Sequence, residues 1–223
     1  MNNIMSFLNK LQENNNREWF AVHKDEYESV KMQFEQSVQK IIDKIAVSDP
    51  QLQGLEAKDC IWRIYRDVRF SYDKRPYKTH FGAFLAKGGR KSPYSGYYLH
   101  LEPDNCIIGG GVWCPDSKLL TALRRSVCDH SEEFLSVLNA PDFKTLYPEL
   151  DKEDMLKTIP RNFPKDFAYP DLLKVKSYLV SHILPDILFD EIDWENKVVT
   201  DFLPLQPFHK FLNYAVEEFY DKD

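Results

Sequence analysis

The chain has 223 residues, of which 43% are hydrophobic and 29% charged, with a formal net charge of −6. This composition is ordinary for a globular protein with a sizeable core, and the net charge excludes a generally basic chain. No apolar run approaches the roughly 20 residues that span a bilayer, so we expect no membrane helix. The N-terminal sequence does not resemble a secretory signal, and the four cysteines contain no CxxC pair. They are therefore expected to be free thiols of a cytoplasmic protein.

Two helices are predicted at the N-terminus. Residues 4–11 form a short amphipathic pattern, which three consecutive asparagines at 14–16 interrupt. Apolar residues then recur at steps of three and four, which predicts one long helix with a single buried stripe. The stripe consists of Tyr27, Val30, Phe34, Val38, Ile41 and Ile45. Asp49 and Pro50 end this helix.

The middle of the chain predicts a mainly antiparallel sheet. β-rich segments separated by Gly, Pro and Asn turns indicate strands near 60–65, 80–86, 95–102 and 105–113. The connection from Glu102 to Asn105 is too short for a helical crossover, so the last two strands are expected to form an antiparallel hairpin.

Helical patterns return after Pro115. They cover residues 118–127, 131–139 and 171–184, and a last helix from Leu205 carries a stripe of Phe208, Leu212, Val216 and Phe219. The Pro-rich stretch 159–170 contains aromatic residues that need burial, which favours a surface loop over a linker. The order of elements predicts a single α+β domain over residues 1–223.

Charge is distributed unevenly along the chain. Residues 61–98 contain nine Lys or Arg and only two acidic residues, giving +7, whereas the rest of the chain carries −13. The same segment contains ten aromatic residues. This asymmetry indicates a local surface that faces an anion.

The segment provides the candidate ligand-binding residues. Arginine supplies a bidentate fork for phosphate or carboxylate, lysine supplies a point charge, and tyrosine can stack or hydrogen-bond. The candidates are Arg63, Arg66, Arg69, Lys74, Tyr77, Lys78 and Tyr97. The competing interpretation is that these arginines form internal ion pairs, for example with Asp67 or Asp73.

Acid–base candidates are few. His80, and His100 with Glu102 two residues later on the same strand face, have the required chemistry, and Asp67 is a further carboxylate candidate. H-x-E alone is a weak pattern that a structural histidine also explains, so no metal site is predicted, and the cofactor is unknown. Glycines 109–111 lack the spacing of a phosphate loop, and a close approach of another backbone explains them better.

Several stretches resemble the bacterial domain-of-unknown-function family 2461. The resemblance is carried by NNNREWF at 14–20 with Tyr27, by RIYRDVRFSYDKRPYKTHFGA at 63–83, and by GYYLHLEP at 96–103. It continues with GGGVW at 109–113, the Pro160–Phe163 region and LLKVKSY at 172–178. The resemblance implies a single-domain cytoplasmic α+β protein, and it implies no substrate.

Three functions are consistent with these features. The favoured one is binding of a small anionic or phosphorylated molecule at the basic aromatic segment. The next is a hydrolase or transferase that uses a His–carboxylate pair, and the third is a nucleic-acid-binding module, which the acidic remainder of the chain disfavours. No membrane partner is expected. The sequence leaves the ligand, catalysis and the oligomeric state open.

Overall fold

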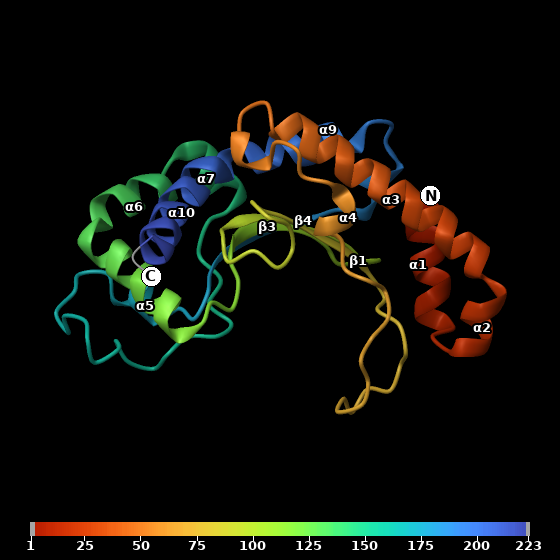
Figure 1. The fold of residues 1–223 in the computed structure, drawn as a ribbon, viewed down its shortest axis with the longest axis horizontal. Helices are drawn as coiled ribbons and strands as arrows, with labels where there is room; N and C mark the ends of the chain where they lie inside the picture. Colours follow the sequence, from red (N-terminus) through yellow and green to blue (C-terminus); the bar gives the residue numbers. More distant parts are fainter. Residues whose placement is uncertain (1–2, 222–223) are drawn as a thin grey trace. The chain divides into compact units, whose positions relative to one another are not determined.

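The computed structural model describes residues 3–221, and it confirms the α+β class (Figure 1). Four strands form one antiparallel sheet in the order β1-β2-β3-β4. The strands are β1 Phe81–Leu85, β2 Gly96–Leu101, β3 Cys106–Val112 and β4 Tyr178–Leu184. The predicted strands 80–86, 95–102 and 105–113 are thus confirmed to within one residue at each end.

The chain divides into two compact units. The first comprises Met1–Arg90, Tyr98–Ile108 and Ile183–Thr200, and the second comprises Lys91–Tyr97, Gly109–His182 and Asp201–Asp223. A single domain over residues 1–223 stays a prediction. No helix within residues 3–221 combines the length and apolar character that crossing a membrane requires.

The first unit is built on the long helix α3 Lys24–Ile45, which contacts α1, α2, α4 and β1. Every residue of the predicted stripe on α3 is buried, because that stripe faces this core. Phe34, for example, stacks on Phe81 of β1 at 5.2 Å between ring centroids. The other elements are α1 Asn3–Glu13, α2 Arg17–Val22, η1 Pro50–Leu52, α4 Ala57–Cys60 and η2 Asp186–Asp190, and α9 Trp194–Phe202 begins in this unit.

The second unit is built on α10 Gln206–Tyr220, which contacts α5 and α6. Phe208, Leu212 and Val216 of the predicted stripe are fully buried, and Phe208 packs against Phe134 and Phe143. The remaining elements are α5 Ser117–Asp129, α6 Ser131–Leu138, α7 Pro141–Leu146, α8 Pro170–Lys174 and η3 Leu203–Leu205.

The helix predicted over 171–184 is wrong for most of its length. Only Pro170–Lys174 is helical, and Tyr178–Leu184 forms β4. A short apolar run fits either structure, and the β-branched Val180 and Ile183 favour the strand. β3 supplies the deciding partner, because its glycines allow the β4 backbone to approach. A Cβ on Gly109 would stand 2.2 Å from the Val180 carbonyl oxygen, which confirms close backbone approach as the role of this glycine.

The strand predicted near 60–65 is also not formed as a continuous strand. Residues 57–60 are helical, and only two isolated antiparallel bridges remain, Ile61 with Ala83 and Tyr65 with Tyr77. A continuous strand does not form because the pairing register changes between these two bridges. This change in register positions side chains of the candidate site.

Candidate functional site

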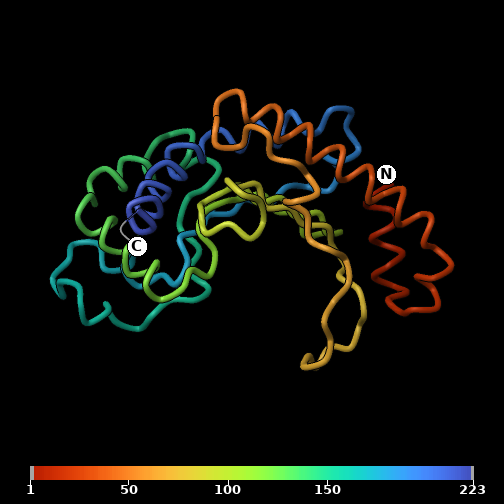
Figure 2. The backbone as a smooth tube through the Cα atoms, viewed as in Figure 1, coloured from red at the N-terminus to blue at the C-terminus, as the bar shows by residue number. Residues whose placement is uncertain are grey.

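The segment 61–83 runs out into a long loop and returns beside itself (Figure 2). Three residues separate the two bridges on the outgoing side and five on the returning side. The returning side therefore bulges by two residues, and Thr79 and His80 lie within this bulge. Bulges change the direction of side chains and are frequent beside active sites. Here the bulge lies next to β2 and brings both side chains to Glu102 and His100.

His80, His100 and Glu102 converge into one cluster. Each contributes one nitrogen or oxygen atom, and these three atoms all lie within 4.8 Å of one another. The two imidazole rings stack with centroids 4.2 Å apart. His100 lies in β2 and Glu102 directly follows its last residue, and His100 Nε2 lies 3.2 Å from Glu102 Oε2. We call these three residues the His-His-Glu cluster.

Glu102 is held as a carboxylate by three donors. The Thr79 hydroxyl donates to Oε1 at 2.5 Å. Asn105 Nδ2 donates to Oε2 at 2.9 Å, and His100 Nε2 is the third donor, also to Oε2. Burial alone would raise the pKa of Glu102, but these hydrogen bonds outweigh burial and hold the pKa below its ordinary value. Glu102 is therefore ionised at neutral pH.

Tyr98 orients the ring of His100. Its hydroxyl lies 2.8 Å from His100 Nδ1, and Trp62 packs edge-on against the Tyr98 ring. Burial, assisted by the charge of Glu102, raises the pKa of Tyr98 to about 12, so the hydroxyl keeps its proton. The partners assign the tautomer of a neutral His100: Tyr98 donates to Nδ1, and Nε2–H donates to Glu102.

His80 stacks on His100 but, unlike His100, its ring makes no hydrogen bond to the described residues. It is half-buried, and neither ring nitrogen makes a hydrogen bond to any residue within the described part of the chain. Burial, together with repulsion from His100 and Lys78, lowers the pKa of His80 to about 4. At neutral pH its ring is therefore uncharged, and one ring nitrogen has a lone pair available for a bound group.

Lys78 lies close enough to the cluster for its charge to act on both histidines, and Arg63 lies close enough to Lys78 to act on that lysine. Lys78 is partly buried, and its pKa is lowered by burial and by Arg63, while its charge in turn lowers the pKa values of both cluster histidines. Arg63 is exposed. Among residues 3–221, neither side chain forms an ion pair or a side-chain hydrogen bond.

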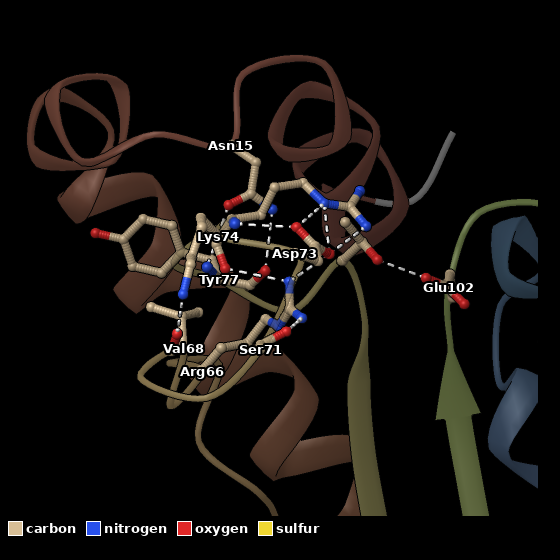
Figure 3. Close-up of polar contacts among 10 residues, drawn as sticks. Asn15, Arg66, Val68, Ser71, Asp73, Lys74, Tyr77 and Glu102 are labelled. Atoms are coloured by element: carbon tan, nitrogen blue, oxygen red, sulfur yellow. Dashed lines mark hydrogen bonds and ion pairs between the residues drawn. The ribbon is translucent and has the colours of Figure 1, made fainter.

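The other two predicted arginines are occupied internally, as Figure 3 shows for Arg66. Arg66 Nη1 pairs with Asp73 at 2.6 Å, and Arg75 pairs with the same carboxylate at 2.8 Å. Hydrogen bonds from Arg75 and Arg66 hold the pKa of Asp73 far below its usual range. Arg69 forms a bidentate pair with Asp67, whose pKa is lowered by it. Asp67 is therefore already paired with Arg69.

The remaining candidates lie elsewhere. Lys74 is exposed and donates to the Val68 carbonyl at 3.1 Å (Figure 3). Tyr77 is buried, stacks on Phe20 at 3.9 Å between centroids, and exchanges backbone hydrogen bonds with the Asn15 side chain. Tyr97 belongs to the second unit and is 1% exposed. Burial of both rings makes them part of the core.

Sequence reasoning missed three residues that hold the cluster: Thr79, Tyr98 and Asn105. Tyr98 had a usable signal, since it precedes His100 by two residues and so shares its strand face. No sequence signal pointed to Thr79, because the position of its side chain depends on the bulge.

The model of one protein family, described as "Conserved hypothetical protein (DUF2461)", matches residues 3–211. The chain belongs to this family. All residues of the site lie within the matched part of this DUF2461 protein. No curated protein and no solved structure gave a match.

Proposed function

We propose that this DUF2461 protein binds a small anionic molecule beside the His-His-Glu cluster, with Lys78 and Arg63 as the anion-binding cations. The observation that carries the proposal is Lys78. A partly buried ammonium group without a carboxylate partner loses hydration and gains no pairing in return. A bound anion would supply the missing partner. The arginine–aspartate pairs, by contrast, already satisfy Arg66 and Arg69.

The chemistry of the two cations limits the class of ligand. Arg63 offers a planar fork that fits a carboxylate or a phosphate group, and Lys78 offers a point charge from a partly buried position. The half-buried His80 ring adds a group that can donate or accept one hydrogen bond. A carboxylate or a phosphorylated small molecule is therefore the expected ligand. A cytoplasmic location, which the four free cysteines favour, is part of the same proposal.

A hydrolase or transferase is the second candidate. It requires an imidazole and a carboxylate within hydrogen-bond reach, and His100 with Glu102 meets that requirement at 3.2 Å. Asp67 cannot serve as the carboxylate partner, because Arg69 holds it. The nucleic-acid alternative is weakened by the same pairing, since Asp67 and Asp73 neutralise arginines that would otherwise contact phosphates.

Replacing Lys78 with alanine is expected to weaken the binding of the ligand anion by about 10- to 100-fold, because charged hydrogen bonds contribute about 1.5–3 kcal/mol. Inorganic phosphate and succinate are suitable first probes, titrated by calorimetry into the full chain as isolated. Arg63→Ala is expected to weaken the same binding.

Arg69→Ala is the matched control, because it removes the same charge from the same segment but belongs to the Asp67 pair. It should bind the anion like the wild type. The proposal fails if the wild type binds neither probe, or if Lys78→Ala and Arg69→Ala bind equally well.

A further inference from the structure

We infer that His80, His100 and Glu102 form a binding site for a divalent transition metal. This deepens the proposed function, because the metal would lie beside the proposed anion. Its geometric basis is independent of the anion: three potential ligand atoms, one from the bulge, one from β2 and one from the residue after β2, lie within 4.8 Å of one another. The sequence predicted no metal, since H-x-E alone is a weak pattern and nothing in it places His80 nearby.

The spacing of the cluster is close to that of a metal centre. Ligand atoms about 2.1 Å from a tetrahedral metal stand ~3.4 Å apart. His100 Nε2 and Glu102 Oε2 are already 3.2 Å apart. His80 completes the set through a small closure of its ring, which no hydrogen bond to the described residues holds in place.

The groups behind the ligands have the arrangement typical of metal sites. Metal-bound histidines donate their second ring N–H to a fixed partner, and bound carboxylates are themselves hydrogen-bonded. Tyr98 lies at His100 Nδ1, and its hydroxyl can accept as well as donate, so Nε2 can give up its hydrogen to bind metal. Thr79 holds the other Glu102 oxygen, Oε1. Two of the three ligands are therefore oriented before any metal binds.

The donor set selects the class of metal. Two imidazole nitrogens and one carboxylate oxygen suit Zn²⁺, Fe²⁺, Co²⁺ or Ni²⁺, whereas Ca²⁺ and Mg²⁺ prefer oxygen ligands alone. Three protein ligands leave at least one coordination position for water or for another ligand.

The neighbouring cations couple the metal to the anion. Lys78 and Arg63 repel a bare dication, because Glu102 offers only one negative charge in the cluster. An anion that contacts Lys78 and occupies the open position of the metal would remove this repulsion. Metal and anion are then expected to strengthen each other's binding by the same factor, as linkage requires.

The direct test is Co²⁺ binding to the full, tag-free chain after treatment with a chelator. Wild-type protein should bind one Co²⁺ and show visible absorption typical of four or five ligands, and Zn²⁺ should displace it. His80→Ala and Glu102→Gln should abolish this spectrum, and Tyr98→Phe should weaken binding about tenfold or more. His130→Ala is the matched control, because it removes an exposed histidine of the second unit. Circular dichroism on each variant separates lost binding from lost folding.

The same experiment separates the two proposals. Lys78→Ala should keep the Co²⁺ spectrum and lose the strengthening of Co²⁺ binding by added phosphate or succinate. Lys78-dependent anion binding by a wild-type protein that shows no Co²⁺ spectrum would overturn the metal site and leave the proposed function intact. A Co²⁺ site without any anion effect would support the metal alone. Equal Co²⁺ binding by the wild type and by a folded His80→Ala variant would overturn the inference.

Discussion

Replacing Gly111 with alanine is expected to lower the free energy of unfolding by more than about 3 kcal/mol. Gly111 has a φ of +133°, which side-chain-bearing residues rarely adopt, and a Cβ there would stand 1.9 Å from the Tyr178 carbonyl oxygen. The blocking atoms belong to the backbone of β4, so no side-chain rotation relieves the clash. Urea unfolding of the full chain measures the loss.

The control for Gly111 is Gly54→Ala. Gly54 also has a positive φ, +75°, but a Cβ there has no neighbour within 4 Å. Its cost is confined to the left-handed backbone, about 1–2 kcal/mol. The difference between the two variants therefore reports the contact between β3 and β4 together with the rarer backbone angle of Gly111. Equal losses would show that the glycine is required only for its backbone angle.

The second large effect is acid destabilisation through His209, which is buried in the second unit. Burial lowers the pKa of His209 to about 3, compared with about 6.5 for an unfolded histidine. At pH values between these two pKa values, His209 is protonated in the unfolded chain but not in the folded chain. The free energy of unfolding is thus expected to fall by up to about 1.4 kcal/mol per pH unit as the pH drops below about 6.5.

The surroundings of His209 explain why it stays neutral when folded. The Ser95 hydroxyl lies 2.7 Å from Nδ1, Tyr97 packs edge-on against the ring, and Nε2 is buried without a hydrogen-bond partner. The absence of a Cβ on Gly110 leaves room for the ring, because that atom would stand 2.5 Å from Cε1. A protonated ring would place an unpaired charge in this core.

Urea unfolding between pH 6.5 and pH 4.5 tests this expectation, in a range above the ordinary pKa values of most carboxylates. His209→Leu should flatten the dependence of stability on pH by about one proton relative to the wild type, whatever its absolute stability. His130→Leu, at an exposed position, should keep the wild-type slope. An unchanged slope in folded His209→Leu would contradict the prediction.

Helix periodicity and short connections were readable from the sequence because both are local. The stripe from Tyr27 to Ile45 on α3 is buried as the 3.6-residue repeat predicts, and so are Phe208, Leu212 and Val216 of the stripe on α10, whereas Phe219 is only partly buried. The tight connection between β2 and β3 likewise dictated an antiparallel hairpin. These elements established the α+β class, and the quoted motifs established the family.

The sequence named Asp67 and Asp73 as possible partners of the arginines but did not decide which cations are paired. Register was not readable either, because it depends on contacts distant in sequence and on loop geometry. The surplus of basic residues at 61–98 pointed to an anion surface, but only the structure showed that Arg66 and Arg69 are neutralised while Lys78 and Arg63 are not. β4 likewise required the glycines of β3, some 70 residues earlier.

The sequence by itself determined the helices with one apolar face, the three strands β1 to β3, and the H-x-E pair at the end of β2, since each follows from the spacing of neighbouring residues. The tertiary structure alone decided which groups meet. The two-residue bulge at Thr79 and His80 turns a strand-like segment toward β2, because the pairing on either side of it differs in register by two residues. That shift places His80 beside His100 and Glu102, so that the H-x-E pair becomes a cluster of three residues.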